Sequence, residues 1–243
     1  MYLIFEFCSL GTLTEHMNSV QGYDLKDVAY IIKQVLLALS AIHENGAIHR
    51  DVKADNVLVK MIDPDPALGP RIKLTDFGFA TKLDHMIGAK ASLGTRHYMS
   101  PEMIKRLEQH TSAVDIWSVG VLAFYLISGG KYPFPGLTKE VVSNKIKNYE
   151  PEMHEIYDRD QETKVAKDFI VKCLKKNPAD RKSAKELLES DTWFTQVNIK
   201  LPKRESMQLI GNMSNNVDHR AKYFQYAITS FITNILIKSQ DVR

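Results

Sequence analysis

Three short motifs in the first half of the chain constrain its fold more than any other feature. Residues 49–56 read HRDVKADN, Asp76-Phe77-Gly78 begins 25 residues after Asp51, and Ser100-Pro101-Glu102 completes the set. One such tripeptide is weak evidence by itself. Their common order and spacing form a specific combination, which predicts a domain in which polar residues of adjoining loops serve one site.

The composition indicates a soluble globular protein with one domain and an appendage. The chain has 243 residues, of which 44% are hydrophobic and 25% are charged. The 32 basic and 29 acidic residues leave a net charge of +3, which gives no electrostatic case for binding nucleic acid or a membrane surface. No apolar run reaches the roughly 18 residues of a membrane span, and no signal peptide is visible. We expect a cytoplasmic protein in which Cys8 and Cys173 are reduced, buried thiols.

Hydrophobic periodicity predicts a mainly helical chain. Apolar residues recur at helical spacing over 25–44, and Asn45-Gly46 suits the end of that helix. The stretch 112–128 is almost continuously apolar, so we expect a helix that is buried on all sides and that Gly129-Gly130 ends. Further helices are expected at 139–148, at 163–175, and at 184–189, the last with Ser183 and Glu186 as a capping box.

Extended structure is expected only near the first two motifs. Val57-Leu58-Val59 and Ile72-Lys73-Leu74 have the composition of short strands. They flank the segment 63–70, whose three prolines and glycine predict a surface turn. Residues 79–99 show no periodicity and predict a loop.

The motifs and their order resemble the large, helical lobe of a eukaryotic serine/threonine protein kinase. The resemblance covers about residues 1–197 and leaves 198–243 as a C-terminal helical tail. It implies a mainly α (α+β) fold, a helical bundle with short β-hairpins at the catalytic cleft. Tyr2–Cys8 is similar to the segment that connects the two lobes of such kinases. We therefore expect the small lobe to be absent, as in a fragment or a truncated gene model.

The resemblance implies residues for transfer of a phosphoryl group from ATP to serine or threonine hydroxyls of protein substrates. Asp51 would be the catalytic base, and Lys53 would neutralise the transferred group. Asn56 and Asp76 would be the two protein ligands of Mg²⁺, which prefers oxygen donors. Lys53 and Asn56 would thus serve both catalysis and ATP binding. The alternative is a catalytically inactive lobe that binds partners, because the glycine-rich loop and strand lysine of the small lobe are not in this sequence.

The resemblance also implies an adenine site. Phe5 would be the gatekeeper, the backbone of Glu6 and Cys8 would hydrogen-bond to adenine, and Leu58 would form the floor of the pocket. Core packing is the alternative for Phe5 and for its neighbour Phe7.

Other residues would support this site. Asp115 would brace the backbone of the loop 49–56, and Glu102 would form an ion pair with Arg181. Asp55 has two readings that remain open: a contact for basic substrate residues, or a solvated loop charge.

Two features concern subfamily and control. Residues 76–80 and 2–8 resemble Unc-51-like kinases, whereas residues 133–136 and the tail resemble calcium/calmodulin-dependent and calcium-dependent kinases. Arg50 implies control by a phosphate in the following loop, for which Ser92 is the nearest hydroxyl before Thr95.

The tail carries apolar residues three and four positions apart, which predicts an amphipathic helix. They are Val217, Ala221, Phe224, Ile228, Phe231 and Ile235. The helix would be an autoinhibitory segment, a binding site for calmodulin or another regulatory protein, or a structural helix packed on the large lobe.

Overall fold

The computed structural model describes residues 6–60, 71–82, 95–107, 110–156 and 160–196. The chain forms two compact units, 1–199 and 200–243, and every described residue belongs to the first. The gatekeeper candidate Phe5, the phosphate candidate Ser92 and the predicted tail helix lie outside the described residues.

Within the described ranges the chain is mainly helical, as the sequence predicts. The helices are α1 (Leu13–Ser19), α2 (Leu25–Glu44), α3 (Pro101–Ile104), α4 (Ala113–Ile127), α5 (Lys139–Asn148), α6 (Gln161–Cys173), α7 (Ala184–Ser190) and α8 (Thr192–Gln196). The strands are β1 (Ala47–Ile48), β2 (Val57–Lys60), β3 (Arg71–Leu74) and β4 (Thr81–Lys82).

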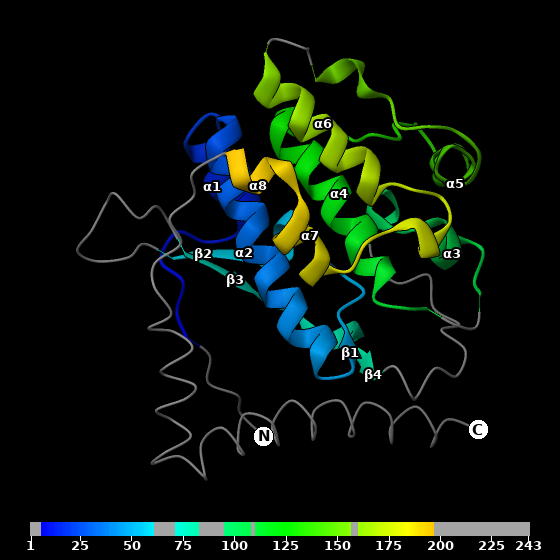
Figure 1. Cartoon of the computed structure of the whole chain (residues 1–243), viewed down its shortest axis with the longest axis horizontal. Coiled ribbons are helices and arrows are strands. Elements are labelled where there is room, and N and C mark those ends of the chain that lie inside the picture. Colours follow the sequence, from blue (N-terminus) through cyan, green and yellow to red (C-terminus); the bar gives the residue numbers. More distant parts are fainter. Residues whose placement is uncertain (1–5, 61–70, 83–94, 108–109, 157–159, 197–243) are drawn as a thin grey trace. The chain divides into compact units, whose positions relative to one another are not determined.

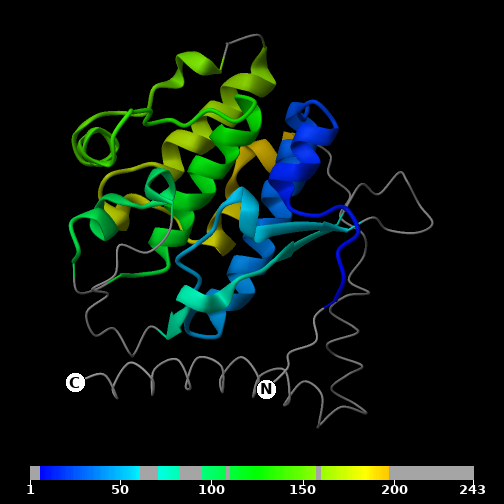
Figure 2. The same cartoon turned by 180° about the vertical axis from the view of Figure 1, so that it is seen from behind.

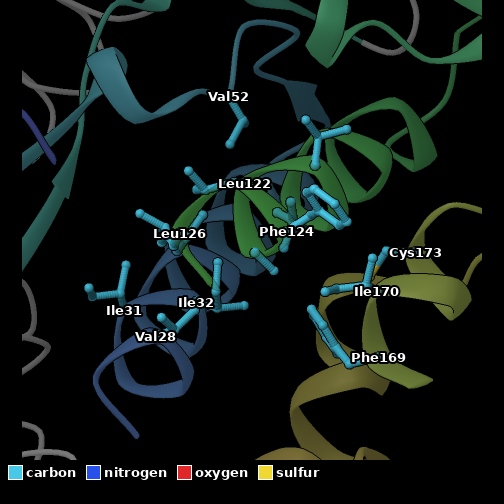
Figure 3. Close-up of a cluster of buried hydrophobic side chains, with 14 of the residues drawn as sticks. Val28, Ile31, Ile32, Val52, Leu122, Phe124, Leu126, Phe169, Ile170 and Cys173 are labelled. Atoms are coloured by element: carbon cyan, nitrogen blue, oxygen red, sulfur yellow. The ribbon is translucent and has the colours of Figure 1, made fainter. Parts of the chain in front are cut away.

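Helix α4 is the centre of the hydrophobic core. It lies between α2 and α6 (Figures 1 and 2), and 13 of its 15 residues are buried. Figure 3 shows side chains of α2, such as Val28 and Ile32, on one side of α4 and those of α6, such as Phe169 and Ile170, on the other. Burying each larger side chain stabilises the fold by about 1.5–3 kcal/mol. Because α4 packs against α2 on one side and against α6 on the other, its sequence is apolar on every face.

Gly120 allows α6 to approach α4 closely. A Cβ atom at this position would lie 2.6 Å from the Cβ of Cys173 and 3.1 Å from the side chain of Leu174. Because real Cβ atoms do not approach other carbons so closely, only glycine fits between the two helices.

Side-chain caps define several helix ends. Asp24 accepts a hydrogen bond from the Asp27 N–H at the start of α2. At the other end Asn45 is the C-cap, and Gly46 follows it with a φ of +71°. Ser183 and Glu186 form the predicted capping box of α7. Thr12 forms another at α1, a helix that we did not predict from the sequence.

The strands form two small antiparallel sheets. In the β2–β3 hairpin Val57 pairs with Leu74 and Lys60 with Arg71, while β1 pairs with β4. Along β2 buried residues alternate with half-buried ones, because successive side chains point to opposite faces.

Most element boundaries agree with the sequence analysis to within one residue, but α6 and the region 79–99 differ more. Helix α6 begins at Gln161, two residues early, because Asp160 caps it, and it ends at Cys173, ahead of Asn177-Pro178. The region expected to be a loop contains β4 and a short 3-10 turn at Arg96–Tyr98. No helix in the described part of the chain is long and apolar enough to span a membrane.

Candidate active site

The loop 49–56 brings the three predicted catalytic residues together. The Asp51 side chain is buried, and its Oδ2 accepts hydrogen bonds from Lys53 Nζ at 2.9 Å and from Asn56 Nδ2 at 2.7 Å. Asn56 Nδ2 also donates to the Asp51 carbonyl at 2.9 Å. Among the described residues no hydrogen bond reaches Asp51 Oδ1. The carboxylate is thus held through one oxygen, and its Oδ1 is left as a hydrogen-bond acceptor.

Asp115, at the start of α4, braces this loop as predicted. Its Oδ2 accepts from the His49 N–H at 2.8 Å, and its Oδ1 accepts from the Arg50 N–H at 2.7 Å. His43 on α2 adds a 2.8 Å contact from Nε2 to Oδ2. Burial would raise the pKa of the Asp115 carboxyl, but the hydrogen bond from His43 and those from the loop bring it below its usual value. The two backbone bonds hold Arg50 at a φ of +66°, a left-handed conformation that is costly for a residue other than glycine.

His49 joins this loop to the Asp76-Phe77-Gly78 segment. Its Nδ1 accepts from the Asp51 N–H at 3.3 Å, and its Nε2 lies 3.1 Å from the Thr75 carbonyl oxygen. An acceptor at Nδ1 and a carbonyl at Nε2 require the neutral ring with its proton on Nε2. Burial lowers the pKa of His49, which agrees with a neutral ring. The ring also packs against Phe77, with centroids 4.9 Å apart.

Asp76 is positioned by its own turn and by the loop 49–56. Its φ is +61°, and its Oδ1 accepts from the Gly78 N–H at 3.2 Å. The Thr75 N–H donates to the Asn56 carbonyl at 2.9 Å, and Arg50 Nε donates to the Phe79 carbonyl at 2.6 Å. These bonds tie the segment that carries Asp76 to the segment that carries Asn56.

The donor set of Asn56 and Asp76 fits a hard divalent cation. Because Asn56 uses its amide N–H groups on Asp51, its amide oxygen is left as an acceptor. Asp76 adds carboxylate oxygens, and Mg²⁺ is commonly bound by one or two protein oxygens with water and substrate phosphates completing the shell. In the described ranges no cluster of three or more His, Cys, Asp or Glu side chains offers a metal site built from protein alone.

Three of the predicted adenine-site residues lie close to β2. Residues 10–11 pair with Val59 through backbone hydrogen bonds of 2.9 and 3.1 Å. Cys8 is buried, whereas the Glu6 side chain reaches outward to Lys60 at 2.6 Å. Leu58 is half-buried on the face of β2 opposite to Val57 and Val59. Phe7 is 81% exposed, so core packing is not the reason for this residue.

The predicted pair of Glu102 and Arg181 forms a buried, bidentate ion pair. Nη1 and Nη2 of Arg181 donate to the two carboxylate oxygens at 2.7 and 2.9 Å. The same guanidinium donates to the carbonyls of Ala113, Lys175 and Lys176 and lies 5.1 Å from the Trp117 ring centroid. The pair fixes the end of the third motif to α4 and to the segment before α7.

The region around Asp55 contains residues that the sequence analysis did not single out. Thr14 Oγ1 donates to Asp55 Oδ1 at 3.1 Å. Tyr98 is buried beside the loop 49–56, where its phenol is hydrogen-bonded to the backbone of Ala54. His97 stacks on Tyr132, with centroids 4.1 Å apart. His43 was missed as well, because no local pattern links it to an aspartate 72 positions later.

Comparison with known proteins decides the family. The family described as protein kinase domain matches residues 1–194. The chain belongs to the protein kinase domain family. Members of this family use ATP and Mg²⁺, and the position of its three motifs around Asp51 agrees with membership.

Relatives of this kinase chain include two serine/threonine-protein kinases and a calcium-dependent protein kinase. It is 32% identical to serine/threonine-protein kinase 33 of Bos taurus over 80% of this chain and 40% of that protein. It is also 32% identical to calcium-dependent protein kinase 4 of Plasmodium berghei (strain Anka), over 84% of this chain and 38% of that protein. The Drosophila melanogaster serine/threonine-protein kinase PAK mbt is 32% identical over 77% and 28%, respectively. The kinase chain thus spans two fifths or less of the length of these relatives.

Proposed function

We propose that this chain carries the catalytic loop of a serine/threonine protein kinase, which transfers the γ-phosphoryl group of ATP to hydroxyl groups of protein substrates. The observation that carries the proposal is the convergence of Lys53 and Asn56 on one oxygen of the buried Asp51 carboxylate. A carboxylate fixed on one side and open on the other suits a group that orients a hydroxyl and takes its proton.

Each loop residue has a distinct part in this proposal. Asp51 accepts the proton of the substrate hydroxyl at Oδ1. Lys53 holds Oδ2. Its positive charge lies next to the carboxylate and neutralises negative charge on the transferred phosphoryl group. Asn56 fixes both the side chain and the carbonyl of Asp51. Phosphoryl transfer depends mainly on such positioning and charge neutralisation.

ATP binding is assigned to two sets of residues. The amide oxygen of Asn56 and the carboxylate of Asp76 are proposed to hold Mg²⁺, which supplies charge neutralisation at the phosphates when it is bound. Leu58 is proposed as the floor of the adenine pocket, with the backbone of Glu6 and Cys8 as its hydrogen-bonding edge. Phe5 is proposed as the gatekeeper.

The acceptor is proposed to be serine or threonine. Lys53 supports this specificity, as does the sequence Gly94-Thr95 before the 3-10 turn at Arg96–Tyr98. The names of the relatives support it too, since those reported above include two serine/threonine-protein kinases.

The limits of the domain and its control are further parts of the proposal. Residues 1–197 are assigned to the hinge and large lobe of the kinase domain, and 198–243 to a helical tail. The likeness to a calcium-dependent kinase and the sequence at 133–136 support the calcium-regulated group, with calmodulin or a similar protein as a partner of the tail. An inactive, partner-binding lobe is the competing assignment.

Transfer of labelled γ-phosphate to peptides tests the proposal. A fusion of a protein-kinase small lobe to residue 1 should label serine and threonine peptides and leave a matched tyrosine peptide unlabelled. Asn56→Ala and Asp76→Asn should each lower transfer at least about a hundredfold, and chelation of Mg²⁺ should abolish it. Asp168→Asn, at an exposed position of α6, is the matched control and should keep full activity. Undiminished transfer by Asn56→Ala, or labelling mainly of tyrosine, would contradict the proposal.

A further inference from the structure

Four aromatic rings gather at one side of the candidate active site. The ring of Tyr132 is the centre of this group. It stacks on His97 with centroids 4.1 Å apart, meets Tyr98 edge-on at 5.8 Å, and lies 5.3 Å from Tyr125. Tyr98 is buried, and its phenol is hydrogen-bonded to the backbone of Ala54. The other three side chains are only partly buried, so the group presents aromatic surface to solvent beside the catalytic loop.

Asp55 brings a carboxylate to the same place. Its side chain is exposed, and its Oδ1 accepts a hydrogen bond from Thr14 Oγ1 at 3.1 Å. Thr14 is also hydrogen-bonded to the phenol of Tyr125. Burial raises the pKa of Tyr125 and of Tyr132, and the negative charge of Asp55 raises both further. One hydroxyl thus links the carboxylate to the first ring, and the charge is felt at the second. Asp55, His97, Tyr125 and Tyr132 form the acid–aromatic surface.

The negative charge of this surface is not balanced within the described part of the chain. Asp55 forms no ion pair with any residue of that part. The basic side chains nearby in the sequence have other partners: Lys53 bonds to the proposed catalytic base, and Arg96 interacts with Glu140. Burial lowers the pKa of His97, so its ring is mainly neutral at pH 7. The acid–aromatic surface therefore combines one unpaired carboxylate with accessible rings.

A guanidinium group matches both parts of such a surface. Its planar, charged fork pairs with a carboxylate, and its face stacks on aromatic rings. A lysine ammonium can form the ion pair, but it is more strongly hydrated and does not stack. An apolar side chain could contact the rings, but it would leave the carboxylate without a partner. The chemistry of the surface therefore favours arginine over lysine, and either of them over an uncharged side chain.

We propose that the acid–aromatic surface binds an arginine side chain of the protein substrate, close to the acceptor residue. The guanidinium pairs with Asp55 and packs on the rings of Tyr125 and Tyr132. Because Tyr98 joins these rings to the catalytic loop, a bound arginine helps to hold the acceptor hydroxyl near Asp51. Of the two readings of Asp55, this inference adopts the contact with a basic substrate residue. It rests on the proposed function, since it takes the ligand to be the substrate.

Peptide binding to the 243-residue chain tests the surface without requiring catalysis. Each peptide has a central serine and one arginine, which is moved through the four positions on either side. Matched peptides carry lysine or citrulline instead, and citrulline keeps the planar shape of arginine without its charge. Fluorine NMR of labelled peptides measures weak affinities. At one position or more we expect arginine to bind about fivefold or more tightly than citrulline and about twofold or more tightly than lysine, less so at high salt.

Variants assign the preference to individual side chains. Asp55→Asn should lower the preference for arginine over citrulline about threefold. Tyr125→Leu should remove the preference for arginine over lysine and keep that for lysine over citrulline, whereas Tyr125→Phe should keep both. Asp168→Asn on α6 and Tyr149→Leu after α5 are exposed controls and should change neither ratio. A merely structural role would weaken all peptides equally and leave the ratios unchanged, and circular dichroism melts confirm that each variant is folded.

Phosphate transfer separates this inference from the proposed function. In the fusion with a small lobe, the best arginine peptide should have a kcat/KM about fivefold or more above that of its citrulline counterpart, and Asp55→Asn should remove most of this advantage. Equal kcat/KM for all peptides would support the kinase function and overturn the inference. An arginine preference in binding with no transfer to any peptide would support the arginine site and contradict the proposed function. Equal binding of all three peptide series, or an arginine preference that survives Asp55→Asn undiminished, would also overturn the inference.

Discussion

The buried pair of Glu102 and Arg181 makes a strong prediction about stability. Arg181→Met removes two charge-assisted hydrogen bonds to Glu102 and the bonds to three carbonyls, and it leaves a carboxylate that is 4% exposed. Breaking one side of such a pair costs about 3–5 kcal/mol. Glu102→Gln keeps one acceptor and should cost less, about 1.5–3 kcal/mol, the value of a hydrogen bond to a charged group. The domain should still fold, since a free energy of unfolding of about 5–15 kcal/mol is usual.

Equilibrium unfolding in urea, followed by tryptophan fluorescence, measures these losses. Both Trp117 and Trp193 are fully buried, so their emission reports the core. The double variant should lose clearly less than the sum of the single losses, because the two residues share their bonds. Lys182→Met, at the exposed neighbouring position, is the control and should change stability by less than about 0.5 kcal/mol. A loss below about 1 kcal/mol for Arg181→Met, or strict additivity in the double variant, would refute the reasoning.

Three more predictions concern the loop and the core. His49 is neutral in the fold and its pKa lies below 6.5, so the unfolded chain binds the extra proton. The contribution of His49 to the free energy of unfolding is therefore fully present above pH 6.5. Below pH 6.5 it falls by up to about 1.4 kcal/mol per pH unit. His49→Phe should remove this part of the pH dependence in urea titrations from pH 7.5 to 5. Gly120→Ala should destabilise by about 1–3 kcal/mol through overpacking, and adding Cys173→Ala, which keeps the opposing Cβ, should not restore stability in the same assay. Asp115→Asn places a side-chain N–H against one of the two backbone N–H donors, those of His49 and Arg50, and should cost about 2–4 kcal/mol. An unchanged urea midpoint would contradict the assigned bracing.

Much of the fold follows from local sequence signals. The limits of α2 follow from a long apolar period and from Asn45-Gly46, and the start of α7 follows from its capping box. The apolar run of α4 correctly predicts a helix buried on all sides. Helix α1 has an equally clear capping box at Thr12, but its seven residues are too few to show a period. The limits of α6 differ because the strong cap at Asp160 outweighs the apolar pattern.

The contacts of the candidate site also fall into two groups, those that sequence motifs predict and those that they do not. The pairing of Glu102 with Arg181 and the bracing by Asp115 follow from motif positions within a resembling family, and the structure contains both. The contact of His43 with Asp115 depends on how α2 packs on α4, which no local pattern encodes. The same is true of the hydrogen bond from the Ile72 N–H to Gln34 Oε1, which joins β3 to α2. Such contacts arise from tertiary packing, and a single sequence does not reveal them.

Phosphate transfer by an Asp51→Asn variant tests the central claim most directly. The variant keeps the size of the side chain and an oxygen for Lys53 and Asn56, but it removes the basic carboxylate. In the fusion with a small lobe, at saturating ATP and serine peptide, we predict a turnover lower by a factor of a hundred or more, with an unchanged urea midpoint and full activity in the Asp168→Asn control. A folded Asp51→Asn protein that turns over at the wild-type rate would contradict the account.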